Sequence, residues 1–337
     1  MMSRKLSLAI SAGALALASC ADGQETEDAR TVTTPEGALM QVNDDLAYKL
    51  GELTPEQLQA STRDLFIQDS MNVFRRFPRD ATADMVKFYT EALALRALNP
   101  IQLTSSQQMI LTGVGTGQIK LSAGQQGDRE YNLDGGPTGG TGIRFFTLSY
   151  PDKQQVLDRF AAAGLPAPEF TDQGDGTEAA LATDPGGFPV QIVIRPGAQD
   201  NSNDGVGVGV SVSDLERSRA FYREFVGLDE LPAEEDALLG ITKYPFRHKE
   251  TTIYVYHAGS DLPSDTGNAG IQYVVSDAAL VDAKAKHRDI TVETPLNQLS
   301  GFDLTTVWLN DPDGVTNYFA QVGPNSRTAQ QARAGGN

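Results

Sequence analysis

The chain has 337 residues, a length that suits two domains of ordinary size, and its 40% hydrophobic and 21% charged residues are typical of a globular protein. Its formal net charge is −17, and an acidic surface repels phosphate backbones, so nucleic acid is not an expected partner. Cys20 is the only cysteine, which excludes an intramolecular disulfide and a cysteine-rich zinc site.

Residues 1–19 are predicted to be a signal peptide rather than part of the fold. Arg4 and Lys5 precede an apolar run that is too short to span a membrane. The segment Leu17-Ala18-Ser19-Cys20 resembles the lipobox of bacterial lipoproteins, which implies cleavage before Cys20 and lipidation of its thiol. The resemblance implies a lipid anchor in the cell envelope, on the outer membrane facing the periplasm. The alternative is an ordinary signal peptide with a chance cysteine.

Residues 20–70 are predicted to form a polar tether followed by helices packed outside the main fold. Thr54-Pro55-Glu56-Gln57 has the spacing of a capping box, with proline at the first helical position. At the other end, residues 324–337 are polar and end in glycines, which predicts a disordered tail.

The most regular stretch is 206–231. Valines at 206, 208, 210 and 212 alternate with Gly207, Gly209, Ser211 and Ser213, which predicts a strand with one apolar face and one face of small residues. Ser213 and Glu216 fit a capping box, and a helix is expected to follow as far as Gly227. A single strand–helix unit cannot close a core, so further copies are expected.

Four such modules follow one another along the chain. Phe88-Tyr89 recurs as Phe221-Tyr222, Asp152 recurs as Asp277, and the Asp-Pro-x-Gly turn at 184 recurs at 311. We expect neighbouring modules to form a first domain over 71–196 and a second over 205–323, joined by a turn-rich linker. The third module is expected to be completed by strands at 237–242 and 251–256.

The segments VSVSDLERSRAFYREFVGLDEL (210–231) and NDPDGVTNYFAQ (310–321) resemble the vicinal oxygen chelate superfamily, which includes glyoxalase I and bleomycin-resistance proteins. The resemblance covers roughly 70–325 and is strongest in the second half. It implies an α+β fold in which four βαβββ modules form two domains. Each domain would be a curved eight-stranded sheet around a cleft, with the helices outside.

The family's metal enzymes, by this resemblance, carry a His or Gln in the first strand of each module and a Glu in the last, around one divalent cation. In the third and fourth modules, these positions fall on Gly207, Gly270, Tyr254 and Tyr318. In the first and second modules, they fall near Val73 or Phe74, Phe145, Lys120 and Gln191. Glycine has no side-chain donor, a neutral phenol is a poor ligand, and lysine repels a cation. We therefore predict no metal site.

Other cofactor and metal signals are weak. A two-histidine site at His248 and His257 is left open, although a histidine near a strand end is more often a surface or packing residue. No Gly-rich phosphate loop, Gly-x-Ser-x-Gly or His-Glu-x-x-His motif is present, so no cofactor is predicted.

Small residues, phenols and amides are expected to face the predicted clefts. These candidate ligand-binding residues are Gly207, Gly209, Ser211, Tyr254, Tyr256, Gly270, Gln272, Trp308 and Tyr318 in the second domain, and Lys120 and Gln191 in the first. The mixture suits metal-independent binding or sequestration of a small, partly aromatic or polycyclic molecule.

Two alternatives remain open. One is an enzyme (a lyase, isomerase or hydrolase) in which Tyr254, Tyr318 or His257 is catalytic. The other is a structural reading, in which Tyr254 and Tyr318 fill the space of the metal and hydrogen-bond to each other. The sequence names no ligand and leaves open whether the chain dimerises.

Overall fold

The computed structural model describes residues 30–33, 39–102, 108–125, 129–198, 205–259, 261–299 and 303–323. The predicted signal peptide, Cys20 and the predicted tail lie outside these ranges. No helix within them combines the length and the apolar character needed to cross a membrane.

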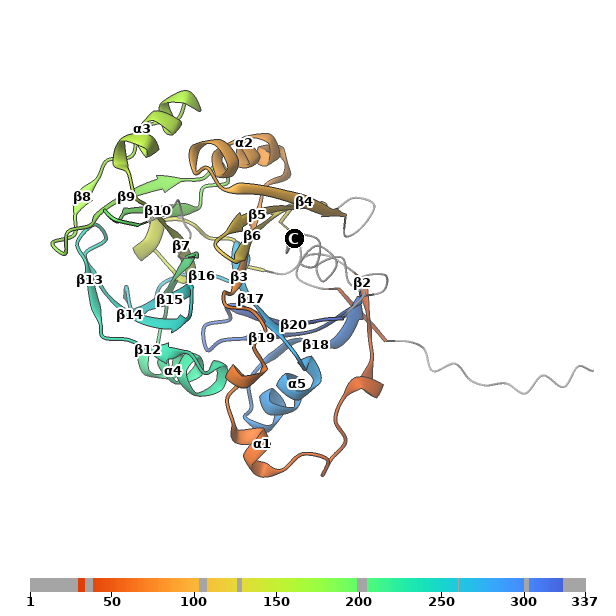
Figure 1. Cartoon of the computed structure of the whole chain (residues 1–337). Helices are drawn as coiled ribbons and strands as arrows, with labels where there is room; N and C mark the ends of the chain where they lie inside the picture. The colour runs from red at the N-terminus through yellow and green to blue at the C-terminus, as the bar shows by residue number, and fades with distance from the viewer. Residues whose placement is uncertain are drawn as a thin grey trace, which may run out of the picture.

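Two curved ten-stranded sheets form the molecule, and the helices lie on their outer sides (Figure 1). Sheet A has the strand order β1-β2-β18-β19-β20-β17-β3-β6-β5-β4. Its strands are β1 Thr31–Thr33, β2 Leu39–Val42, β3 Asn72–Phe77, β4 Arg96–Gln102, β5 Gln108–Val114, β6 Gly117–Ala123, β17 Ala269–Val275, β18 Val292–Leu299, β19 Leu304–Asn310 and β20 Thr316–Val322.

Sheet B has the strand order β12-β14-β15-β11-β7-β10-β9-β8, with β13 paired to β14 and β16 paired to β7. Its strands are β7 Thr141–Tyr150, β8 Thr171–Asp172, β9 Glu178–Thr183, β10 Pro189–Ile194, β11 Gly207–Ser211, β12 Asp229–Glu230, β13 Glu234–Asp236, β14 Ile241–His248, β15 Thr251–Tyr256 and β16 Ser264–Asp265. The resemblance to the vicinal oxygen chelate fold is therefore confirmed, because each sheet contains eight strands from two modules and two additional strands.

Five α-helices occur in the described ranges: α1 Pro55–Gln59, α2 Thr82–Lys87, α3 Lys153–Ala162, α4 Leu215–Ala220 and α5 Ala278–His287. Two π-helical turns, Phe88–Ala92 and Phe221–Val226, continue α2 and α4. Short 3-10 turns lie at Asp44–Leu46, Arg63–Leu65, Arg79–Ala81 and Gly136–Thr138.

The capping predictions have different outcomes. The Thr54 capping box is confirmed, since Gln57 N donates to Thr54 Oγ1 at 3.2 Å and Thr54 N donates to Gln57 Oε1 at 2.8 Å. The predicted Ser213 cap is wrong: α4 begins one residue later, and the side chain of Asp214 accepts from Arg217 N at 3.1 Å. Ser213 N donates instead to the Asp313 carboxylate, a partner 100 residues away that local sequence does not reveal.

The pairing of the modules differs from the prediction. The first strand of module 1, β3, lies antiparallel to the first strand of module 4, β17. In the same way, β7 of module 2 pairs with β11 of module 3. Modules 1 and 4 therefore share sheet A, and modules 2 and 3 share sheet B, so the expectation that neighbouring modules share a sheet is wrong. The expected domain boundaries, 71–196 and 205–323, stay a prediction.

The alternation in β11 is confirmed by burial. Val206, Val208, Val210 and Val212 are each at most 1% exposed and belong to the main hydrophobic core. The small residues between them lie on the opposite, inner face of sheet B. The strand expected at 237–242 is wrong, because residues 237–240 form a turn between β13 and β14.

The N-terminal extension packs outside the modules, as expected. The Lys284 ammonium of α5 donates to the carbonyls of Gln57 and Ala60 at the end of α1. The Arg63 guanidinium donates to Gly227 O of module 3 at 3.1 Å. The extension also supplies β2, which pairs with β18 at one edge of sheet A.

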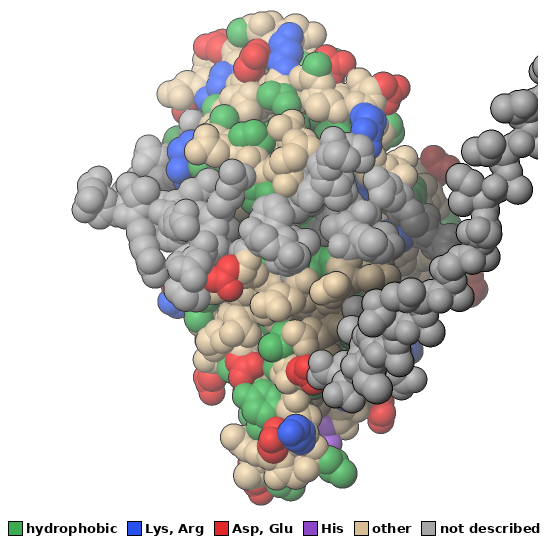
Figure 2. Space-filling model, turned by 90° about the vertical axis from the view of Figure 1, so that its right-hand side faces the viewer, with side chains coloured by type: hydrophobic (Ala, Val, Ile, Leu, Met, Phe, Trp, Pro, Cys, Tyr) green, Lys and Arg blue, Asp and Glu red, His purple; other side chains and the backbone are tan. Residues whose placement is uncertain are grey.

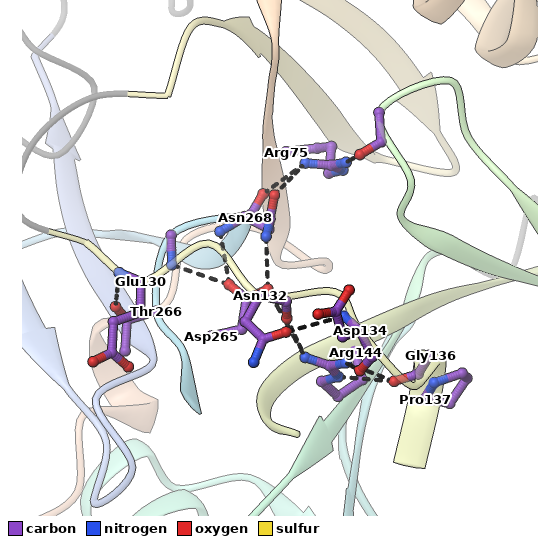
Figure 3. A network of polar contacts seen from close by, with 12 residues as sticks. Arg75, Glu130, Asn132, Asp134, Gly136, Pro137, Arg144, Asp265, Thr266 and Asn268 are labelled. Atoms are coloured by element: carbon purple, nitrogen blue, oxygen red, sulfur yellow. Dashed lines mark hydrogen bonds and ion pairs between the residues drawn. The ribbon is translucent and has the colours of Figure 1, made fainter. Parts of the chain in front are cut away.

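A buried polar network joins the two sheets (Figure 3). Arg75 of β3 donates through Nε to Asp184 Oδ2 at 3.0 Å, and Asp184 lies in the turn between β9 and β10 of sheet B. The same guanidinium donates to Asn268 Oδ1 at 3.0 Å. Asn268 donates in turn to Asp265 of β16 at 2.7 Å. These contacts fix the orientation of one sheet relative to the other.

On the face that Figure 2 shows, the coloured acidic and basic side chains are interspersed rather than gathered in a field of one sign. Among the described side chains of this face, no continuous basic tract is visible.

Candidate functional site

The predicted site residues divide between the inner faces of two different sheets. Gly207, Gly209, Ser211, Tyr254, Tyr256 and Gln191 belong to sheet B, whereas Gly270, Gln272, Trp308, Tyr318 and Lys120 belong to sheet A. The prediction that Tyr254 and Tyr318 face one cleft is therefore wrong, and so is the reading in which they bond to each other. Both errors follow from the module pairing.

The strand registers show which positions are equivalent. In sheet B, Gly207 lies opposite Thr147 and Gly209 lies opposite Phe145, so a local two-fold relates Gly207 to Phe145. In sheet A, Asn72 lies opposite Gln272 and Phe74 lies opposite Gly270. Asn72 and Phe74 lie on the inner face of β3, whereas Val73 belongs to the main hydrophobic core.

The donor set of sheet B does not fit a divalent cation. Its four family positions hold Phe145, Gly207, Gln191 and Tyr254, without a carboxylate or an imidazole. The Gln191 amide is already used, since Oε1 accepts from Thr147 Oγ1 at 3.0 Å and Nε2 donates to Asp236 at 2.7 Å.

The donor set of sheet A fits a cation no better. Its positions hold Asn72, Gly270, Lys120 and Tyr318. The Lys120 ammonium donates to Gln272 Oε1 and lies 3.4 Å from the Tyr318 hydroxyl, where it would repel a cation. Within the described ranges, no three His, Cys, Asp or Glu side chains come together as metal ligands would.

Aromatic side chains fill the inner face of sheet A around Gly270. A methyl group at Gly270 would lie 1.8 Å from Phe74 Cζ, so the Phe74 ring occupies the space above that glycine. Trp308 and Tyr318 stack with ring centroids 4.2 Å apart, and both are at most 5% exposed. Their flat faces therefore contact each other, and the structural reading describes this face well.

The inner face of sheet B is also filled around Phe145 and Tyr256. Phe145 and Tyr256 pack together with centroids 5.9 Å apart, and Ile241 joins them. The Tyr256 hydroxyl donates to the Pro137 carbonyl, and burial raises the pKa of this phenol, so it stays neutral. A methyl group at Gly209 would lie 2.2 Å from Phe145, which explains the glycine at that position.

The same inner face is open around Thr147 and Tyr254. It contains two pockets of about 420 and 380 Å³, which share Thr147, Arg195, Arg247 and Tyr254 in their walls. The larger pocket also reaches Gln191, and the smaller one reaches Gly207. We call this paired hollow the sheet B cleft. Its volume is in the range of small-molecule sites, and it lies over three of the four family metal positions.

A charged cluster in the sheet B cleft was missed by the sequence analysis. The Lys243 ammonium lies 2.9 Å from Asp236 Oδ2 and 4.6 Å from the centre of the Tyr254 ring. Asp236 lies on β13 and Lys243 lies on β14, and the two strands form a hairpin. The sequence analysis missed this hairpin because it expected a strand at 237–242, where the turn lies. The alternation of Lys243, Pro245 and Arg247 with two buried or half-buried aromatics is the signal that could have located β14.

The histidines have other roles. His248 Nε2 is 2.9 Å from Gln68 O, and its ring meets Phe66 edge-on. His257 Nδ1 is 2.9 Å from Val212 O. Each ring is held by a backbone carbonyl from a different segment, as expected for packing residues rather than for a shared metal site.

The family model "Glyoxalase/Bleomycin resistance protein/Dioxygenase superfamily" matches residues 75–192. This match covers modules 1 and 2, although the sequence analysis placed the strongest resemblance in the second half. No curated protein matched the chain.

Two solved structures share the fold over most of the chain. Glyoxalase I from Zea mays has a TM-score of 0.58 and 19% identity, and the match covers 75% of this chain and 92% of that one. A putative dioxygenase from Bacillus subtilis subsp. subtilis str. 168 has a TM-score of 0.57 and 13% identity, covering 79% and 87%. At these identities the likeness concerns the fold alone. Residues 75–192 thus match the glyoxalase/bleomycin resistance protein/dioxygenase superfamily model, and the chain shares the fold of glyoxalase I.

Proposed function

We propose that the chain is a lipid-anchored envelope protein that binds or sequesters a small organic molecule, without a metal, in the sheet B cleft. The observation that carries the proposal is an open hollow above family metal positions that hold Gly207, Gln191 and Tyr254. The hollow is retained although the chelating groups are replaced. A cleft that served only as packing would be filled, as Phe74, Trp308 and Tyr318 fill the inner face of sheet A.

We expect Thr147→Leu to weaken ligand binding by at least tenfold. Thr147 lies in the wall of both pockets, so the larger side chain narrows them where they meet, and it also removes the bond to Gln191 Oε1. Binding is measured by isothermal titration with a compound that native mass spectrometry finds bound to protein purified from the source cell.

The matched control is Thr306→Leu, the same substitution on the filled inner face of sheet A, where Thr306 is 3% exposed. Both variants must keep the circular-dichroism spectrum and a cooperative melt. Loss of binding in Thr306→Leu but not in Thr147→Leu would place the site on sheet A. A stoichiometric transition metal in protein purified without chelators would refute metal-independent binding.

The membrane anchor is a separate part of the proposal, supported by the lipobox-like segment that ends at Cys20. We expect Cys20→Ser to move the protein from the membrane fraction to the soluble fraction, because lipid chains supply the membrane affinity. Fractionation followed by intact mass measurement reports both the location and the lipid. An unchanged distribution, or an unlipidated wild-type mass, would contradict the anchor.

An enzyme is the second candidate, favoured by the Asp236–Lys243 pair beside Tyr254. Such a cluster holds a proton donor and an acceptor within one cleft and would suit a lyase, isomerase or hydrolase. Turnover that survives EDTA and is lost in Lys243→Met but not in Tyr318→Phe would support it. Turnover that is unchanged in both Lys243→Met and Tyr254→Phe would exclude it.

A further inference from the structure

Exposed apolar side chains are concentrated in the N-terminal extension. Within the described ranges, the exposed large hydrophobic side chains all precede module 1, and they are Leu46, Tyr48, Leu50 and Ile67. The first three lie at alternate positions of one short segment, and Leu50 is fully exposed, at 107%. A single exposed leucine is common on a protein surface, whereas such a concentration indicates an interaction surface. We call residues 46–50 the apolar segment.

The fold holds the apolar segment in place and turns its larger side chains outward. A 3-10 turn, Asp44–Leu46, leads into it, and Ala47 N donates to Asp44 O at 3.1 Å. The small side chain of Ala47 packs against the main core, while Tyr48 OH donates to Asp277 Oδ2 of module 4 at 2.7 Å. Water favours the opposite arrangement, with the leucines buried and the alanine exposed. The arrangement therefore suits an apolar partner outside the chain.

The predicted tether enters the described structure beside the apolar segment. The guanidinium of Arg30 lies 3.7 Å from the carboxylate of Asp44, two residues before Leu46. The carbonyl of Arg30 accepts from Val42 N at 2.9 Å, which fixes this entry point against β2. Only residues 21–29 separate Arg30 from Cys20, and such a stretch spans at most about 35 Å. A lipid anchor at Cys20 therefore keeps the apolar segment close to the bilayer.

The chemistry of the segment suits the surface of a phospholipid bilayer. Leucine side chains enter the acyl region, and a tyrosine places its ring and its hydroxyl at the boundary with the headgroups. Lys49 lies between Tyr48 and Leu50, and it combines an aliphatic stem with a cationic end that can reach lipid phosphates. Asp45 and Glu52 flank the segment and are repelled by an anionic surface. The matching partner is therefore a zwitterionic lipid surface.

We propose that Leu46, Tyr48 and Leu50 form a second membrane contact, inserted at the surface of the bilayer that holds the lipid anchor. The inference rests on the anchor in the proposed function and adds the surface that orients the protein. In Figure 1, β2 and the turn that follows it lie on the opposite side of the molecule from β8 and β13 of sheet B. Contact through the apolar segment therefore keeps the sheet B cleft away from the bilayer and open to the aqueous compartment.

The test uses a tryptophan as a reporter, because the only tryptophan of the chain, Trp308, is 3% exposed. Full mature lipidated protein carrying Leu50→Trp is reconstituted into vesicles of phosphatidylcholine and phosphatidylethanolamine. Part of the phosphatidylcholine is brominated near the top of its acyl chains. We expect bromine to quench the new tryptophan about threefold more strongly than Trp308 of the wild type, because the segment inserts to the depth of the acyl boundary.

Gln154→Trp is the matched control, because Gln154 is exposed on α3, which lies at the opposite end of the molecule from α1 (Figure 1). We expect this reporter to stay unquenched. Equal quenching of the two reporters, or an unquenched Leu50→Trp in lipidated protein, would overturn the membrane contact and leave the anchor standing. Intact mass of the same sample separates the two proposals, since an unlipidated mass would overturn the anchor and this contact together.

A second copy of the chain is the other occupant that the experiment distinguishes. Sedimentation of Cys20→Ser protein gives the oligomeric state without lipid chains. We expect the further substitution Leu50→Ser to leave both the sedimentation coefficient and the thermal melt unchanged, because the Leu50 side chain is fully exposed. A dimer that dissociates in Leu50→Ser would assign the apolar segment to a self-interface and overturn the membrane contact.

Discussion

We expect Arg75→Met to lower the free energy of unfolding by about 3–5 kcal/mol, because it leaves a carboxylate buried without its counter-charge. The Arg75 and Asp184 side chains are both 0% exposed, and the guanidinium donates to Asp184 through Nε and Nη2. It also donates to Gly186 O and Asn268 Oδ1. Urea denaturation monitored by circular dichroism measures the loss.

Two further variants identify the cause. Arg63→Met removes an arginine from the exposed pair with Asp229, where the side chains are 42% and 59% exposed, and we expect a loss of less than about 1 kcal/mol. Arg75→Met combined with Asp184→Asn is expected to be more stable than Arg75→Met alone, because the amide removes the buried charge. A double variant no better than the single one would show that packing, not charge, sets the loss.

Asp311→Asn is expected to stabilise the protein relative to wild type as the pH rises from 5 to 7.5. Asp311 occupies the turn of module 4 that corresponds to Asp184, but β11 carries Val208 and Val210 on its core face, where β3 carries Arg75. Its carboxyl accepts from Tyr222 OH at 3.0 Å and from the backbone N–H groups of Asp313 and Val315. Burial without a cation raises the pKa of Asp311 to about 7.

The sign of the effect follows from proton linkage. The folded state keeps the Asp311 proton up to about pH 7, whereas the unfolded chain loses it near pH 4. This group therefore contributes stability at low pH, and that contribution is lost as the pH rises to about 7. Asparagine resembles the protonated acid and does not titrate, so the difference grows by at most about 1.4 kcal/mol per pH unit.

Urea denaturation of both proteins at pH 5, 6 and 7.5 measures this difference. A difference that stays constant across the series would contradict the raised pKa. Asp184→Asn serves as the comparison, because it removes a charge that Arg75 compensates. We expect that variant to be destabilised at all three pH values.

Local sequence patterns determined most of the secondary structure. The alternation of valines with glycine and serine predicted β11, and β15 begins and ends where the sequence analysis placed it. The pattern is informative there because one face is buried and the other is lined by small residues. It failed at β14, where Lys243 and Arg247 lie on the inner face and interrupt the apolar alternation.

The candidate site could be predicted only in part. Gly207, Gln191 and Tyr254 were found because their family positions can be counted along each module. Arg195 and Arg247 were not found, because an arginine at a strand end or on an edge strand has no distinctive local signal. Asp236 was missed because its role depends on two hydrogen bonds across the fold, from the Lys243 ammonium and the Gln191 amide.

The sequence by itself determined that the chain consists of four related strand–helix modules, and that their metal positions lack carboxylates and imidazoles. Both facts are properties of single segments, set by the spacing and the chemistry of neighbouring residues. Only the tertiary structure decided that module 1 pairs with module 4 and module 2 with module 3. That choice depends on which strand edges meet across more than 60 residues of chain, and buried contacts such as Arg75 with Asp184 help to fix it. The same choice placed Tyr254 on sheet B, in the wall of an open cleft, and Tyr318 on sheet A, stacked against Trp308.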